Sequence, residues 1–173
     1  MVTAAFAAFL LMGPACNDAH PANARTTSPA GKRAPAKREA VRPEAGPRVL
    51  LDGRDEQVAV RVEIARDPAT RARGLMFRRQ MDPDAGMIFL FERSEVQDFW
   101  MKNTYLPLDM IFIGADLRVV GVVEDAEPLT ETTRTVGQPS QYVLETNAGF
   151  ARRHGIGPGA RVVFEGIGEG ERE

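Results

Sequence analysis

The sequence holds 173 residues, of which 43% are hydrophobic and 27% are charged. This length supports one domain with a buried core and an appendage, but not two such domains. The formal net charge of −2 gives no reason to expect a nucleic acid as the main partner.

An uncharged and largely apolar segment occupies residues 1–16 and ends at the only cysteine, Cys16. It is too short to span a bilayer as a stable helix and is typical of a signal peptide. The residues before Cys16 resemble a lipobox, and a lone cysteine in an exported chain has no disulfide partner. We therefore predict a lipid on Cys16 that anchors the protein to a membrane on the periplasmic side of the cell envelope. The alternative is cleavage after the "ANA" of residues 22–24, which gives a soluble periplasmic or secreted protein.

Residues 17–47 are rich in alanine and proline and carry six Lys/Arg against three Asp/Glu. By contrast, residues 48–173 carry sixteen Lys/Arg and twenty-one Asp/Glu. A segment with so few large apolar side chains cannot offset the entropy lost on ordering. We therefore predict a disordered tether over 17–47, a single globular domain over 48–167 and a short tail over 168–173.

The domain opens with two predicted strands followed by a helix. In "RVLLDGRDEQVAVRVEIA" two apolar runs flank an acidic turn, and every second residue from 58 to 64 is Val or Ile, which predicts a strand with one buried face. Asp67 then fits an N-cap and Pro68 fits the first position of a helix. Ala, Leu and Met recur at helical spacing over 69–76, so we expect a short helix that covers the sheet.

Further strands are expected wherever apolar runs lie between Gly, Asp and Pro. "FIGADLRVV" predicts a tight hairpin, and Asn147 is expected to begin a helical turn that ends near His154. The predicted fold is α+β and mostly β: a small antiparallel barrel or rolled sheet with one or two short helices packed on it. The remaining predicted strands are 86–91, 108–114, 117–123, 142–146 and 160–166.

Two sequence patterns are rejected as cofactor or metal sites. "GIGPGA" at 155–160 has the spacing of a dinucleotide fingerprint, but it precedes a strand and holds Pro158 where a helix should begin. His20 lies in the tether and His154 at the end of the helical turn, so they do not form a metal centre. No cofactor is predicted.

Five methionines fall between residues 76 and 110. Thioethers are ligands for Cu(I), and Met76, Met87 and Met101 are the candidates for such a site. These methionines lie among Leu, Phe, Ile and Trp, where Met commonly fills a core, so core packing is the favoured interpretation.

The segment "DFWMKNTYLPLDMIFIG", residues 98–114, places polar side chains beside a hydrophobic run. In the predicted strand Asp109 shares a face with Ile111 and Ile113, so a carboxylate begins an otherwise apolar row. A carboxylate near a core must be paired or hydrogen-bonded. One interpretation is an ion-pair latch, for which Lys102, Arg73 and the amide of Asn103 are the candidate partners.

The other interpretation is a ligand pocket in which Trp100 forms an apolar wall while Lys102 and Asn103 donate to a ligand oxygen. It favours a binding domain, not an enzyme, for a small anionic or glycan-like molecule, because the chain shows no activated nucleophile. The alternative is a hydrolase in which Asp109 and Glu145 act as acid and base, which requires both to open on one cleft. The candidate ligand-binding residues are Arg73, Trp100, Lys102, Asn103, Asp109 and Glu145.

Four motifs occur in a fixed order: "RARGLMFR", "GMIFLF", "FWMKNTYLPLDMIFIG" and "YVLETNAG". With these motifs the sequence resembles the bacterial and archaeal family called domain of unknown function 192, over about residues 57–166. The resemblance implies a compact, β-rich single domain, often behind an export signal. It brings no established reaction, ligand or catalytic residue. Tyr105 stands where the family more often has a smaller aliphatic residue, and we expect it to narrow any pocket.

Overall fold

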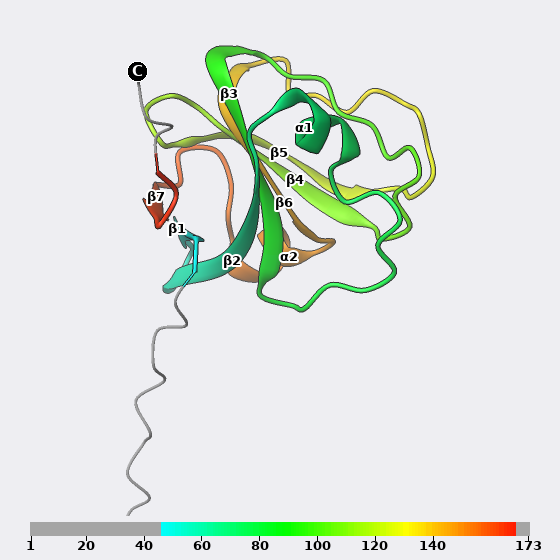
Figure 1. The fold of residues 1–173 in the computed structure, drawn as a ribbon. Coiled ribbons are helices and arrows are strands. Elements are labelled where there is room, and N and C mark those ends of the chain that lie inside the picture. The colour runs from blue at the N-terminus through cyan, green and yellow to red at the C-terminus, as the bar shows by residue number, and fades with distance from the viewer. Residues whose placement is uncertain (1–45, 169–173) are drawn as a thin grey trace, which may run out of the picture. The chain divides into compact units, whose positions relative to one another are not determined.

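The computed structural model describes residues 46–168. The predictions for the signal peptide, for residues 17–45 of the tether and for residues 169–173 of the tail lie outside this range. Strands and two short helices make up the described part (Figure 1). Its elements are β1 (Arg48–Asp52), β2 (Gln57–Ala65), α1 (Pro68–Arg73), β3 (Ala85–Val96), β4 (Leu108–Ile113), β5 (Val119–Ala126), β6 (Pro139–Asn147), α2 (Phe150–His154) and β7 (Val162–Glu165).

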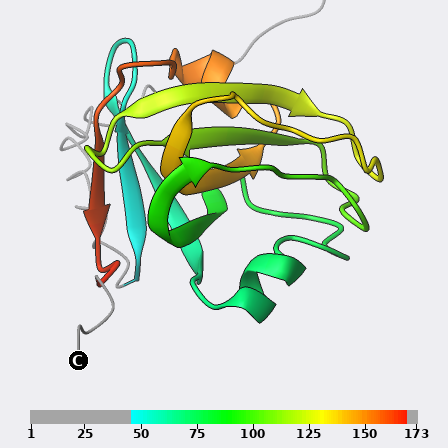
Figure 2. The ribbon, with the colours of Figure 1, turned by 90° about the horizontal axis from the view of Figure 1, so that it is seen from above.

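The strands form one sheet in the order β5-β4-β6-β3-β2-β1-β7. Every neighbouring pair is antiparallel except β2 and β3, which are parallel. The sheet curls, so that β1 and β7 cross the direction of β4 and β5 (Figure 2). Main-chain bonds join the two edges: the Val119 N–H donates to the Ala160 carbonyl and the Val162 N–H to the Leu117 carbonyl, both at 2.9 Å. The predicted rolled, mostly antiparallel sheet with short helices is therefore confirmed.

The start of α1 follows from its sequence. The Asp67 carboxylate accepts bonds from the backbone N–H groups of Thr70 and Ala69, at 2.9 and 3.0 Å, and Pro68 occupies the first turn. These hydrogen bonds lower the pKa of Asp67, and the bond from the Thr70 backbone N–H has the largest effect. The helix ends at Arg73 with no buried side chain, so it is shorter than the spacing over 69–76 predicts. Leu75, which follows the helix, supplies the buried contact instead.

Two apolar layers cover the two faces of the sheet. In β4, Ile111 and Ile113 belong to the layer inside the curl, whereas Met110 and Phe112 belong to the layer on the other face. This alternation confirms the predicted face of Ile111 and Ile113. The helix α2 packs on the inner layer against β4 and β5, and α1 lies on the opposite side of the sheet (Figure 1).

The second helix begins later than predicted. Asn147 is the last residue of β6, and its side-chain amide donates to the carbonyls of Asp82 and Met81, at 2.9 and 3.3 Å. The helix follows Gly149, whose φ of 77° is a backbone conformation that glycine adopts readily. Within residues 46–168, no helix has the length and apolar character needed to cross a membrane.

Candidate functional site

Asp109 is completely buried, and its carboxylate accepts three backbone hydrogen bonds. The donors are the N–H groups of Asp125 and Ala151, both at 2.9 Å, and of Gly149 at 3.1 Å. The expectation that this carboxylate is hydrogen-bonded is met by backbone groups and not by Lys102, Arg73 or Asn103. Asp109 therefore fixes the start of α2 and the end of β5 against β4, which is a structural task.

Glu145 faces the other side of the sheet. In the β4–β6 ladder Asp109 pairs with Thr146 and Met110 pairs with Glu145, and directly paired residues share a face. The carboxyl groups of Asp109 and Glu145 therefore do not open on one cleft, and they cannot act as the paired acid and base of a hydrolase.

The carboxyl group of Glu145 lies in apolar surroundings without a partner. The residue is only 4% exposed. None of the described residues forms an ion pair or a hydrogen bond with its carboxyl group. Burial alone raises the pKa of Glu145 to about 8, because no neighbouring charge compensates the anion. The group is therefore largely protonated at pH 7 and can donate a hydrogen bond.

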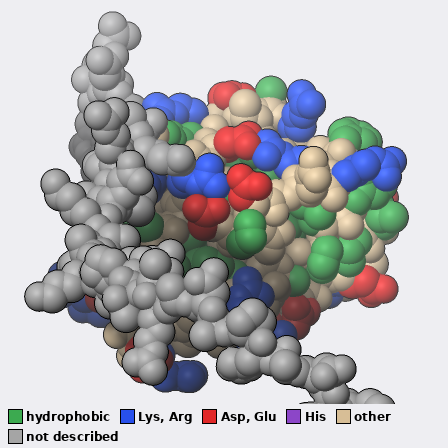
Figure 3. Space-filling view, turned by 90° about the horizontal axis from the view of Figure 1, so that it is seen from below, with side chains coloured by type: hydrophobic (Ala, Val, Ile, Leu, Met, Phe, Trp, Pro, Cys, Tyr) green, Lys and Arg blue, Asp and Glu red, His purple; other side chains and the backbone are tan. Residues whose placement is uncertain are grey.

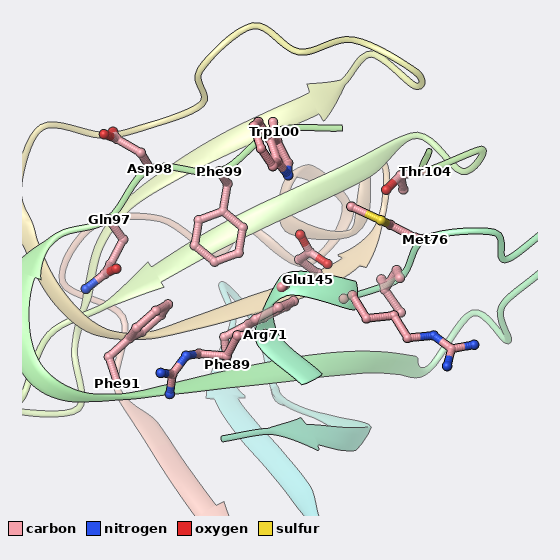
Figure 4. Close-up of a pocket in the computed structure, with 14 residues that line it drawn as sticks. Arg71, Met76, Phe89, Phe91, Gln97, Asp98, Phe99, Trp100, Thr104 and Glu145 are labelled. Carbon is pink, nitrogen blue, oxygen red and sulfur yellow. The ribbon is translucent and has the colours of Figure 1, made fainter. Parts of the chain in front are cut away.

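A cavity of about 240 Å³ lies above Glu145. In Figure 4 the Glu145 carboxyl group points toward the space between Phe99, Trp100 and Met76. The cavity is lined by α1 and the residues that follow it, by β3, and by the β3–β4 loop, which we define as residues 97–107. Its lining includes Arg71, Arg73, Met76, Phe89, Phe91, Gln97, Asp98, Phe99, Trp100, Thr104 and Glu145.

The β3–β4 loop is held in place by main-chain hydrogen bonds to two other connections. The N–H of Phe99 donates to the carbonyl of Arg134 at 2.9 Å, and the N–H of Arg134 donates back at 2.7 Å. The N–H of Phe77, in the segment after α1, donates to the carbonyl of Asn103 at 2.8 Å. The loop is thus a built wall of the cavity and not a free segment.

Aromatic rings form the wall nearest to the sheet. The ring of Phe99 makes edge contacts with Phe89, Phe112 and Phe91 at centroid distances of 5.1, 5.9 and 6.3 Å. Such contacts stabilise the ring positions beyond simple burial. Phe99 therefore presents a fixed apolar surface toward the cavity.

Two arginine side chains belong to the cavity lining, and they differ in how many contacts their guanidinium groups already make. Arg71 donates to the carbonyls of Leu90, at 2.9 Å, and of Arg66, and its guanidinium lies 5.2 Å from the ring centroid of Phe91. Arg73, at the end of α1, is exposed. Its guanidinium group forms no hydrogen bond or ion pair with any described residue. Arg73 is therefore the cation that a ligand can engage without breaking an existing contact.

Lys102 and Asn103 do not line the cavity. The ammonium group of Lys102 lies 3.3 Å from the Glu131 carboxylate and 5.5 Å from the Trp100 ring centroid, so the predicted Lys102–Asp109 latch is absent. The side-chain amide of Asn103 lies 3.9 Å from the Met76 sulfur. One face of the domain exposes hydrophobic side chains among basic and acidic ones (Figure 3). The side chain of Trp100 is also exposed, since the residue is 52% accessible.

Of the six residues that the sequence predicts for a ligand site, Arg73, Trp100 and Glu145 line the cavity. The sequence did not predict the aromatic wall of Phe89, Phe91 and Phe99, because aromatic residues are common in buried strands and these three show no pattern that distinguishes a cavity wall from a core. A signal for Phe99 exists in hindsight, since it neighbours the only tryptophan in a segment with many polar residues.

Comparison with known proteins adds a family but no activity. The model of the family DUF192, described as "Uncharacterized ACR", matches residues 49–164. One similar crystal structure is that of a proposed transcription regulator from Sinorhizobium meliloti, whose sequence is 44% identical. The match covers 68% of this chain and 92% of that protein's chain, with a TM-score of 0.66. Another is the crystal structure of a protein of unknown function from Novosphingobium aromaticivorans, whose sequence is 42% identical. The match covers 67% of this chain and 83% of that protein's chain, with a TM-score of 0.65. No curated protein matches the chain.

Proposed function

This chain belongs to the DUF192 family, whose function is uncharacterised, and we propose that it is a binding domain of the cell envelope that takes a small anionic or glycan-like ligand in the cavity above Glu145. The observation that carries this proposal is a buried carboxyl group, without a partner, directed into a cavity with aromatic walls. A buried polar group without a partner costs free energy, and a ligand that hydrogen-bonds to it recovers that cost.

The chemistry of the lining favours a ligand with oxygen acceptors and an apolar face. Protonated Glu145 can donate to a hydroxyl, carbonyl or carboxylate oxygen at the floor. Arg73 at the rim can pair with an anionic group. The rings of Phe99 and Trp100 supply flat apolar surfaces against which a sugar ring or an aliphatic body can pack.

We do not extend the regulator role of the Sinorhizobium meliloti protein to this chain. Residues 48–173 carry sixteen Lys/Arg and twenty-one Asp/Glu, a net charge of −5. Recognition of DNA relies on a basic surface that neutralises phosphates. This excess of acidic residues argues against DNA as the ligand.

Thermal melting of the purified full-length chain tests the proposal. We expect small carboxylates, phosphate or short glycans to raise the melting temperature, because a ligand that binds only the folded state stabilises it. Trp100→Ala and Arg73→Ala should reduce that rise. Lys102→Met is the matched control, since Lys102 lies in the same region but does not line the cavity. The proposal fails if none of these ligands shifts the wild-type melting temperature, or if the two cavity variants respond as the wild type does.

A further inference from the structure

Glu145 lies between two methionines in a row that runs across three strands. Its Cα partners in the ladders are Met87 on β3 and Met110 on β4. Directly paired residues of antiparallel strands point to the same face, with Cβ atoms about 4.5–5.5 Å apart. The row therefore places one methionine on either side of Glu145, on the same face of the sheet.

All three residues of this Met87–Glu145–Met110 row are buried, with exposed fractions of 7%, 4% and 0%. Met76 lines the same cavity as Glu145 and also lines a neighbouring pocket together with Met87. Its sulfur is contacted by the Asn103 amide at 3.9 Å. A third thioether is thus available on the path between the cavity and the row.

Core packing explains the methionines but does not explain the carboxyl group. Methionine is a common filler of apolar layers, and Met87 and Met110 belong to such a layer. An ionisable group in the same layer, without any partner, is costly unless something binds it. The row therefore contains a buried carboxyl group that no described residue binds, and a cation that replaces its proton would supply the missing partner.

We propose that Met87, Glu145 and Met110 bind one monovalent soft metal ion, Cu(I), which reaches the row past Met76. Thioether sulfur is a ligand that selects Cu(I), and hard ions such as Mg²⁺ and Ca²⁺ require several oxygen ligands. Among residues 46–168 no group of three or more His, Cys, Asp or Glu side chains is placed to hold a metal ion, which argues against a zinc-type centre.

Charge balance favours a monovalent ion. One carboxylate and one Cu(I) ion form a neutral pair, which an apolar layer accepts far more readily than either charge alone. Binding converts the neutral carboxylic acid to the metal carboxylate, so one proton leaves Glu145 for each ion taken up. No change of oxidation state is involved.

This inference goes beyond the proposed function, because it concerns a buried row that includes two residues outside the cavity lining, and it holds even if no organic ligand binds. Trp100→Ala separates the two. We expect this variant to weaken binding of an organic ligand and to leave uptake of the metal unchanged. The reverse pattern is expected for the Met87→Leu/Met110→Leu double variant.

The experiment is a titration of the full-length chain with Cu(I), without oxygen and with a reductant, in competition with a chromophoric Cu(I) chelator. All proteins carry Cys16→Ser, because the only thiol of the chain would itself bind Cu(I). We expect one ion per chain and, in weakly buffered solution, release of protons as the ion binds. Titration with Ag(I), which is not redox-active under these conditions, should give the same stoichiometry.

Three variants identify the ligands. Met87→Leu/Met110→Leu keeps the volume of the apolar layer and should abolish uptake in the concentration range in which the parent binds. Glu145→Gln keeps the shape and should weaken binding and eliminate the proton release. Met81→Leu is the matched control, because Met81 packs at the edge of the same layer but outside the row. The proposal is overturned if the parent protein takes up no ion. It is also overturned if the Met87→Leu/Met110→Leu variant has a normal melting temperature and takes up as much ion as the parent.

Discussion

Asp109 and Glu145 lie on the neighbouring strands β4 and β6, and their side chains leave opposite faces of the sheet. Three backbone N–H groups bind the Asp109 carboxylate, whereas none of the described residues binds the Glu145 carboxyl group. Two buried acids that look alike in the sequence therefore have different roles. Asp109 holds the fold together, and Glu145 is available to a ligand.

Replacement of Asp109 by Ala should destabilise the domain strongly. The change leaves three backbone donors without an acceptor, and each buried donor of this kind costs about 1–3 kcal/mol. We expect a loss on the order of 3 kcal/mol or more in the free energy of unfolding, measured by urea denaturation. Asp109→Asn, which retains one acceptor oxygen, should lose less.

The control for this prediction is Asp55→Ala, because Asp55 is exposed and has no partner among the described residues. An exposed substitution of this kind is expected to change stability by less than about 0.5 kcal/mol. If Asp109→Ala is as mild as the control, the three hydrogen bonds do not hold α2 in place.

Glu145 should make the stability of the domain fall as the pH rises. The folded-state pKa of about 8 lies above the ordinary value of 4.5, so between these values the folded state holds a proton that the unfolded state has lost. The contribution is fully present below pH 4.5 and is lost as the pH rises through 8, a change on the order of 5 kcal/mol. Urea denaturation at several pH values measures it.

Glu145→Gln removes this titration and is therefore the reference for that measurement. The difference in stability between Glu145→Gln and the wild type should grow from pH 5 to pH 8 and then level off. A difference that stays constant over this range would mean that Glu145 is charged, and hence paired, in the folded protein.

Lys102→Met should have little effect on stability. Lys102 is 44% exposed at its side chain and pairs with Glu131, which is 62% exposed. Exposed ion pairs contribute about 0–1 kcal/mol, whereas loss of the buried Lys102–Asp109 pair considered from the sequence would cost on the order of 3–5 kcal/mol. A loss in the larger range on urea denaturation would show that Lys102 has a buried partner.

Cys16→Ser tests the proposed membrane anchor, which lies outside the described residues. If a lipid is attached to Cys16, the variant should leave the membrane fraction for the soluble envelope fraction or accumulate as an uncleaved precursor. Cell fractionation with immunodetection measures this. Wild-type protein that is wholly soluble, with a mature N-terminus at Arg25, would instead support cleavage after "ANA".

The sequence predicts the strands well because their signals are local. The alternation from residue 58 to 64, the hairpin after β4 and the Asp67 cap each depend on neighbouring residues, and each is present in the structure. The β3 strand continues beyond residue 91, where the prediction ends. The ladder with β6 is irregular between Leu90 and Glu95, and the polar end of β3 then pairs again with the start of β6.

The site is harder to predict, because it depends on strand register. Whether Glu145 meets Asp109 or Met110 is decided by the pairing of β6 with a strand more than thirty residues earlier, and a shift of one residue would exchange the faces. The sequence places Glu145 at a strand end, whereas β6 continues to Asn147. The partner of Lys102 was missed for a similar reason, since Glu131 lies on a separate connection.

The single parallel pair of the sheet governs how a solute reaches Glu145. Parallel neighbours such as β2 and β3 require a crossover connection, and here residues 66–84 make it, with α1 near its start. The helix α1 has no buried side chain itself, but Arg71 donates to the Leu90 carbonyl and the buried Leu75 follows directly after the helix. The crossover is therefore anchored beside the cavity, and a solute reaches the Glu145 carboxyl group through the space between the crossover and the β3–β4 loop while the sheet beneath keeps its shape.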